Sequence, residues 1–200
     1  MAKKGYTTRQ EIENYLLITI DPSFYTQVDN WIEEIEAYID QMTGRNFVAD
    51  SLASAKYFDG DNTPELLIED AVAITEIKIG DNAALVADTD PLQADGDFIL
   101  YPANHLPITK IQLRSAYFPA SPLRCVKVTG KWGYSVEAPA DVRQAATVLV
   151  AGIINYSWNA EGEVSSMTIG RYSVTYKTDQ SWKDFERIPS ILKHYRKFTF

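Results

Sequence analysis

The chain has 200 residues and a mass of 22.5 kDa, enough for one full-sized domain or for one domain with a smaller inserted one. Its composition, 46% hydrophobic and 23% charged with 10 glycines and 9 prolines, excludes disordered, collagen-like and low-complexity proteins. The single cysteine, Cys125, excludes an intramolecular disulfide and a zinc site built on several thiolates. No apolar run reaches the roughly 18 residues that span a bilayer, so we expect a folded protein that stays where it is made.

Charge is unevenly distributed along the chain. The net charge is -8, but residues 1–100 contribute -14 and residues 101–200 contribute +6. An acidic total disfavours non-specific binding to nucleic acid, because that binding depends on cations that neutralise phosphates. The polarised distribution suits a protein that stacks on a partner, although charged residues that merely solvate exposed faces would give the same counts.

Two helices are predicted near the amino terminus. Thr8 and Glu11 have the spacing of a capping box, which starts the first helix. Asp21 and Pro22 start a second, long amphipathic helix over about 22–43, and Gly44 is placed to end it. The polar face of that helix is an acidic stripe that we expect to be solvated, comprising Asp29, Glu33, Glu36 and Asp40.

Short alternating segments between turn residues predict antiparallel strands from about 55 to 133. Six candidates are 55–58, 65–68, 73–79, 97–101, 109–113 and 124–130. Beyond them, the sequence predicts an apolar helix over 142–159 whose small residues allow another helix to approach closely. A hairpin of 165–169 and 172–177 follows, and Pro189 opens a short last helix over 190–195.

The residues offer little for catalysis or for metal binding. His105 and His194 lie in no ligand motif, and the sequence contains no nucleophile elbow, phosphate loop or dinucleotide fingerprint. The segment 59–62 has two carboxylates and an amide, but it lacks the length of a calcium loop and is typical of a plain turn. Cys125 is interpreted as a buried structural thiol. We therefore expect no enzyme activity, no metal and no cofactor.

Three tryptophans, Trp132, Trp158 and Trp182, admit two interpretations. Large aromatic side chains supply interface contacts, but single tryptophans more often belong to the core. We favour the core for all three.

Several segments in a fixed order resemble one protein family. The first is Gly130-Lys131-Trp132-Gly133-Tyr134, followed by Pro139-Ala140-Asp141-Val142-Arg143-Gln144-Ala145-Ala146. The others are 7–17 with Asp21-Pro22, then 166–174, and finally Ile188-Pro189-Ser190-Ile191-Leu192 with Tyr195-Arg196. Together they resemble the head-to-tail connector proteins of tailed phages, also called adaptor or head-completion proteins. The long β-rich stretch departs from the compact, all-helical members.

The resemblance and the change of periodicity together predict an α+β fold. The resemblance implies a helical connector core at 1–49 and 128–200, and the alternating segments predict an inserted antiparallel β-rich lobe at 50–127. It implies a structural virion protein that forms a ring, commonly of twelve subunits, beneath the portal. Such a ring extends the DNA channel and joins capsid to tail. The expected partners are the portal, neighbouring copies and the next neck or tail protein, while DNA passes through without sequence-specific binding. Alternatives are another neck or tail-terminator ring protein, or a small ligand-binding module.

The carboxy-terminal segment is the candidate interface. It alternates basic and aromatic side chains to its end, and terminal segments are usually frayed unless they dock. The resemblance implies that it orders on the portal or on a neighbouring subunit, with contacts from Tyr195, Arg196, Lys197, Phe198 and Phe200. The alternative is an ordinary last helix that folds back on its own subunit.

Overall fold

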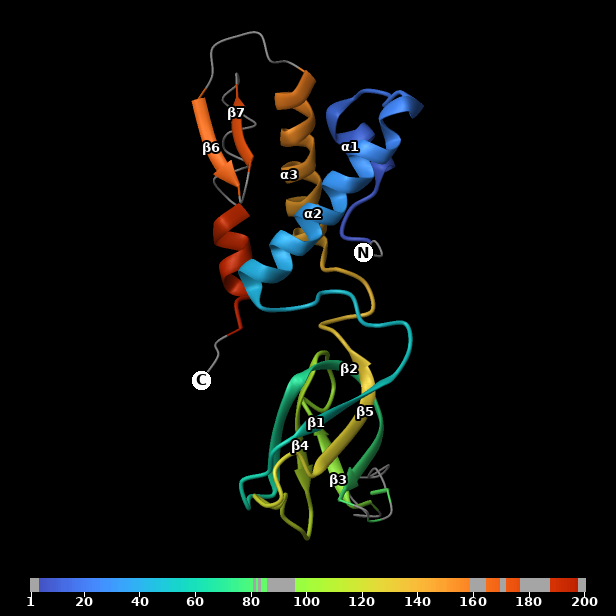
Figure 1. Ribbon diagram of the computed structural model, residues 1–200, viewed down its shortest axis with the longest axis vertical. Helices are drawn as coiled ribbons and strands as arrows, with labels where there is room; N and C mark the ends of the chain where they lie inside the picture. The colour runs from blue at the N-terminus through green and yellow to red at the C-terminus, as the bar shows by residue number, and fades with distance from the viewer. Residues whose placement is uncertain are drawn as a thin grey trace. The chain divides into compact units, whose positions relative to one another are not determined.

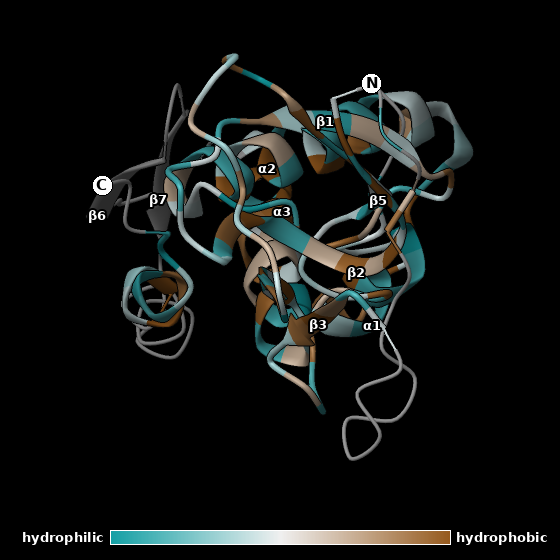
Figure 2. Ribbon diagram, turned by 90° about the horizontal axis from the view of Figure 1, so that it is seen from below, coloured by the Kyte–Doolittle hydropathy of each residue, from teal (hydrophilic) through white to brown (hydrophobic). Residues whose placement is uncertain are grey.

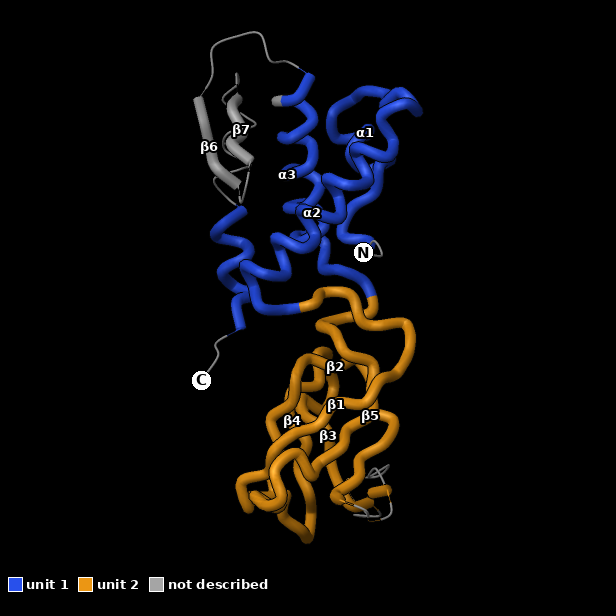
Figure 3. Tube along the Cα trace, in the orientation of Figure 1, with its two compact units in different colours: residues 1–45, 137–200 blue, residues 46–136 orange. Residues whose placement is uncertain are grey.

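The protein has an α+β fold, as the sequence predicts (Figure 1). The computed structural model describes residues 4–80, 82, 84–85, 96–158, 165–169, 172–176 and 188–197. The chain divides into two compact units, which we call the helical unit and the sheet unit (Figure 3). The helical unit comprises 1–45 and 137–200, and the sheet unit comprises 46–136. The sheet unit is therefore inserted between two parts of the helical unit.

The sheet unit extends beyond the expected lobe of 50–127 at both ends. The strand β5 (Val126–Trp132) pairs with two other strands of the sheet, and the expected boundary after residue 127 divides this strand. A bridge between Val48 and Ser135 adds the flanking segments to this unit. The sequence boundary was misplaced because the family-like segment 130–134 lies partly in β5. That each unit is an independent domain stays a prediction.

The helical unit begins with the predicted capping box. Thr8 accepts from the Glu11 amide at 3.2 Å and Glu11 accepts from the Thr8 amide at 2.8 Å, which fixes the start of α1 (Arg9–Leu16). The predicted second helix starts as a 3-10 turn, η1 (Pro22–Phe24), and continues as α2 (Tyr25–Thr43). Gly44 ends α2 with φ of 67°, in the predicted left-handed position.

The central element of the helical unit is α3 (Ala140–Trp158), which contacts α1, α2 and the strand β7 (Figure 1). Its middle is buried on every side, including Ala145, Ala146, Val148, Leu149, Val150, Ala151, Ile153 and Ile154. A helix that is apolar all round has to be surrounded by other elements. The predicted small residues Ala145, Ala146 and Ala151 lie in this buried stretch.

The predicted hairpin follows α3. It comprises β6 (Ser165–Ile169) and β7 (Tyr172–Tyr176), paired antiparallel from Ser165 opposite Tyr176 to Ile169 opposite Tyr172. The turn residues 170–171 lie outside the described part. Residues 188–194 are helical, which confirms a last helix with bounds slightly different from those predicted.

Five strands of the described residues form one antiparallel sheet in the order β1-β5-β2-β4-β3. They are β1 (Ser54–Phe58), β2 (Glu65–Ile79), β3 (Phe98–Tyr101), β4 (Ile108–Leu113) and β5. The predicted strands 65–68 and 73–79 are one strand, β2, whose register shifts once against β4 and twice against β5. Figure 2 shows both hydrophobic and hydrophilic residues along β2, and exposed and buried residues alternate over 65–70. The alternation places one row of side chains in the core and one outside it.

Two glycines of the family-like segment allow close backbone contacts in the sheet unit. A Cβ on Gly130 would lie 2.5 Å from the Ala73 carbonyl oxygen, where β2 is irregular. Gly133 has φ of 153°, and a Cβ there would lie 2.4 Å from the Ala49 Cα. The glycines at both positions are thus explained by packing.

Candidate functional site

The described residues contain no group of three or more His, Cys, Asp or Glu side chains arranged to hold a metal ion. The Nδ1 of His194 lies 2.8 Å from the Ser190 carbonyl oxygen within the last helix, and His105 is exposed. Cys125 is only partly buried, contrary to the prediction, because it lies at the edge of the core just before β5. Its thiol donates to the Pro119 carbonyl at 3.4 Å.

The segment 59–62 is a turn, as predicted. The Asp61 carboxylate accepts from the Thr63 amide at 3.1 Å, and the Asn62 side chain accepts from the Ala120 amide at 3.1 Å. The Asp59 carboxylate accepts from the Arg124 amide. These oxygens bind backbone donors, so the turn anchors the loop that precedes β5.

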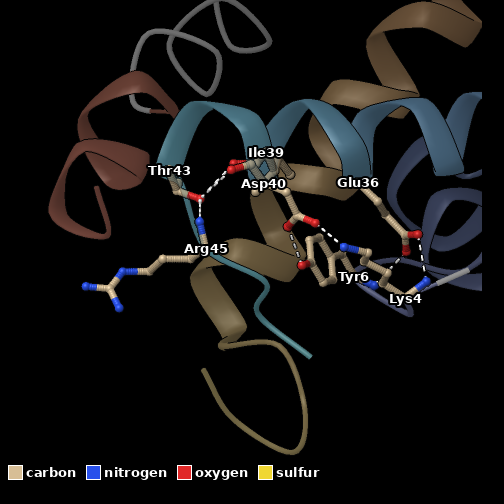
Figure 4. Close-up of polar contacts among 7 residues, drawn as sticks. All are labelled: Lys4, Tyr6, Glu36, Ile39, Asp40, Thr43 and Arg45. Atoms are coloured by element: carbon tan, nitrogen blue, oxygen red, sulfur yellow. Dashed lines mark hydrogen bonds and ion pairs between the residues drawn. The ribbon is translucent and has the colours of Figure 1, made fainter. Parts of the chain in front are cut away.

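The acidic stripe of α2 was predicted to be solvated, and this prediction is wrong for Glu36, which is only 2% exposed. Its carboxylate accepts from the Lys4 amide at 2.7 Å and from the Tyr6 amide at 2.9 Å (Figure 4). Asp40, one helical turn on, accepts from the Tyr6 hydroxyl and pairs with the Lys4 ammonium. Asp29 pairs with Arg9 of α1. The stripe thus binds the segment that leads into α1.

The amino-terminal segment 4–7 also contacts α3. The Tyr6 side chain is fully buried, and the Thr7 hydroxyl lies 2.7 Å from the Thr147 hydroxyl. Residues of α2 and α3 therefore hold the segment 4–7, which we call the N-terminal strap. The only sign of this segment in the sequence was a tyrosine just before the capping box.

The carboxy-terminal segment is also attached to its own unit as far as residue 197. The Tyr195 hydroxyl donates to both oxygens of Asp141 at 2.9 and 3.0 Å. The Arg45 guanidinium donates to the Tyr195 carbonyl, and the Lys197 amide donates to the Thr43 carbonyl at 2.8 Å. The last helix thus bridges the end of α2 and the start of α3.

These contacts decide which predicted interface residues can take part in docking. Ile188 and Leu192 are buried, so the apolar face of the last helix is used within the unit. Tyr195 is held by Asp141, whereas the Arg196 side chain is exposed. Phe198 and Phe200 lie outside the described residues. The alternative interpretation, a helix folded back on its own subunit, thus describes 188–197.

The tryptophans differ from one another. Trp132 is 3% exposed and donates from Nε1 to the Ser54 carbonyl at 2.9 Å, which confirms its place in the core. Trp158 is 38% exposed, which contradicts the prediction, because it lies in the last turn of α3, beyond the buried stretch 145–154. Its ring lies against that of Phe24, with centroids 5.4 Å apart. Trp182 lies outside the described residues.

Trp158 and Phe24 are two of five exposed large hydrophobic side chains that lie at the end of α1, in the segment between α1 and α2, and at the end of α3, and that were not predicted from the sequence. We call these five residues the apolar loop cluster, and they are Tyr15, Leu17, Ile18, Phe24 and Trp158. Leu17 is 89% exposed and has φ of 55°, a left-handed conformation that branched and bulky residues rarely adopt. The segment between α1 and α2 lies beside the carboxyl end of α3 (Figure 1). The signal in the sequence was the apolar run 16–20, which continues past the end of α1.

Comparison with known proteins gives a match at the level of structure only. No family model and no curated protein matches the sequence. A protein in the neck of an empty gene transfer agent (GTA) particle, computed with C6 symmetry, superposes with a TM-score of 0.58 at 13% identity. That match covers 100% of this chain and 94% of the other.

Two further structures agree. The neck of a native GTA particle computed with C12 symmetry gives a TM-score of 0.51 at 16% identity, over 96% of this chain and 88% of the other. The virion of a native GTA particle gives 0.55 at 15% identity, over 100% and 94%. In the part of this chain that the structure describes, no helix has the length and apolar character to cross a membrane. The chain has the fold of these neck and virion proteins.

Proposed function

We propose that the protein is a structural component of a phage-like virion neck, where it forms a ring beneath the portal. In this role it extends the channel for DNA and joins the capsid to the tail, and it performs no catalytic step. The observation that supports the proposal best is the extent of the structural match, which covers the whole of this chain and 94% of a neck protein. The sheet unit therefore has a counterpart in that protein, and the insertion no longer argues against the resemblance.

A ring of six or twelve subunits is the proposed assembly, because the similar neck structures were computed with C6 and C12 symmetry. Each subunit of a ring presents two different faces that fit one another, and apolar residues left exposed on the subunit are buried on closure. We assign the apolar loop cluster to one of these faces, with a second copy of the chain as its partner. The acidic net charge of -8 suits a channel past which DNA slides without binding.

We propose that the carboxy-terminal segment contacts the portal while residues 188–197 stay attached to the helical unit. Arg196 and Lys197 would pair with carboxylates of the portal, and Phe198 and Phe200 would fill apolar pockets. Tyr195 would instead position this segment through its bond to Asp141. Replacing Arg196 and Lys197 by Glu tests the contact, because the buried Ile188 and Leu192 are left in place.

The experiment that tests the ring is the mass of the purified full chain by light scattering, with negative-stain images, alone and with the portal. Wild type is expected to form a closed ring of six or twelve copies, at least on the portal. Leu17→Asp is expected to prevent closure, while Leu67→Asp, the same change on an exposed position of β2, serves as the matched control. A chain that stays monomeric under every condition and does not bind the portal would refute the proposal. Rings that bind a tail protein but no portal would favour the tail-terminator alternative.

A further inference from the structure

A cationic depression lies on the sheet unit. Its volume is about 460 Å³, and it is lined by Tyr57, Lys78, Gly80, Asn82, Arg124, Cys125 and Lys127. We call Tyr57, Lys78, Arg124 and Lys127 the cationic patch. The lining residues named here include three cations and no carboxylate.

The register of the strands builds this patch. Lys127 of β5 lies directly opposite Tyr57 of β1 and directly opposite Lys78 of β2, so the three residues form one row across three neighbouring strands. Residues opposite one another in antiparallel strands point to the same face. Two lysines in directly opposite positions are unfavourable for the isolated sheet, and a bound anion removes this repulsion.

In the described part of the sheet unit, the cations of the patch differ in whether a carboxylate pairs with them. Lys56 and Lys110 of the same sheet form ion pairs with Glu69 and Glu65, at 2.5 and 2.8 Å. Lys78 pairs with Glu76 at 3.1 Å. Among the described residues, no ion pair is found for the side chains of Arg124 and Lys127.

The loop that precedes β5 presents the arginine. Arg124 has φ of 56°, and its amide donates to the Asp59 carboxylate, so this carboxylate fixes the backbone of the loop. The preceding residue, Leu123, is 76% exposed, and Tyr57 is 60% exposed. Arginine and tyrosine are the residue types enriched at the centres of protein interfaces, where they combine charge with apolar contact area.

We propose that the cationic patch binds carboxylate groups of an acidic segment of a partner protein. The Lys127 and Arg124 side chains would pair with the carboxylates, and Tyr57 would pack against their stems. Nucleic acid fits less well, because the sheet unit has 12 acidic and 7 basic residues and a net charge of -5. This charge repels a long polyanion but tolerates a short local contact. The inference does not depend on the proposed role in a virion neck.

The test measures binding of a fluorescein-labelled oligo-aspartate peptide to the full chain by anisotropy, at low and at physiological ionic strength. We expect saturable binding that Lys127→Glu weakens at least about tenfold, because reversal of one central charge removes an ion pair and adds repulsion. Lys131→Glu is the matched control. It makes the same change of charge on an exposed position of the same strand, outside the depression, and should weaken binding by less than about threefold.

Cys125 gives a second, local measurement, because it is the only cysteine of the chain and lines the depression. Peptide at ten times its dissociation constant should slow alkylation of Cys125 by iodoacetamide by up to about tenfold, since only the unoccupied site reacts. The proposal is overturned if no peptide binding is detected, if both variants weaken it equally, or if alkylation is unaffected. A duplex DNA that binds more tightly than the peptide and is lost in Lys127→Glu would also overturn it and identify a nucleic-acid site.

Discussion

Replacement of Glu36 by alanine tests how the N-terminal strap is held. The carboxylate accepts from two backbone amides, at 2.7 and 2.9 Å, and Glu36 is 2% exposed. Hydrogen bonds to a charged group contribute about 1.5–3 kcal/mol each, and an amide left without a partner in a buried place costs about 1–3 kcal/mol. The variant can respond by releasing the strap or by keeping it in place with two poorly satisfied amides.

The magnitudes favour the second response. Release would expose the fully buried Tyr6 side chain, about 150–250 Å² of surface, which costs roughly 4–6 kcal/mol at 25 cal/mol per Å². This exceeds the cost of the two amides, because only the Tyr6 bond is buried, at about 1–3 kcal/mol when it is lost, while the Lys4 bond is partly buried and its loss costs less. We therefore expect Glu36→Ala to lower the free energy of unfolding by about 2–4 kcal/mol while the strap stays bound. Glu36→Gln retains one acceptor oxygen and should lose about 1–3 kcal/mol.

Urea denaturation followed by circular dichroism measures these changes, and hydrogen exchange of the Tyr6 amide locates them. Gln41→Ala is the control, because Gln41 is exposed on the same helix and its loss should change stability by less than about 0.5 kcal/mol. The reasoning is refuted if Glu36→Ala unfolds within 0.5 kcal/mol of wild type, roughly the limit for a surface change. Hydrogen exchange of the Tyr6 amide at the wild-type rate in Glu36→Ala would also contradict the reasoning.

Four further predictions concern single features. The pKa of Asp21 is lowered from its ordinary value by hydrogen bonds from the Ser23 hydroxyl and amide. The contribution of this carboxylate to stability is therefore present above pH 3.8 and is lost as the pH falls through the lowered pKa, and Ser23→Ala should raise this pKa in a carboxyl NMR titration. Gly133→Ala should destabilise the protein by about 2 kcal/mol or more in urea, since its Cβ would meet the Ala49 backbone. The segment 46–136 expressed alone should melt cooperatively by calorimetry, because it has its own core; a gradual melt would argue against an independent domain. Lys127→Glu should raise the unfolding free energy by about 0.2–1 kcal/mol, as an opposite-charge pair with Lys78 replaces two like charges.

Local signals in the sequence predicted most of the helices because each has a physical cause within a few residues. The Thr8 and Glu11 capping box, the left-handed Gly44 and the small residues of α3 all act over one or two helical turns. The hairpin of β6 and β7 was found from alternation around a glycine turn. Such features need no knowledge of distant contacts.

Three of the errors involve partners far apart in the chain. Glu36 is buried because residues 4–6 lie on it, and its position on the polar face of α2 gave no sign of this. The two predicted strands of β2 are one, because irregular pairing with β5 lets the strand continue through 69–72. The lobe boundary failed for the same reason, since β5 joins the sheet through contacts with residues more than 45 positions earlier. The cationic patch, too, needed the strand register.

The described charges separate into those that hold the chain and those that face outward. Glu36 and Asp59 accept from backbone amides and Asp141 accepts from a tyrosine hydroxyl, so these carboxylates fix segments of the protein and are occupied before any partner arrives. A catalytic carboxylate would need to reach a substrate, and these three already have donors within their own unit. Lys127 and Arg124 differ, since they gather beside a second lysine with no ion pair found for them in the described part of the sheet unit. A protein that acts by contact is expected to satisfy its structural charges internally and to keep its recognition charges for a partner. The cationic patch is therefore the first surface of this acidic chain to test for a partner.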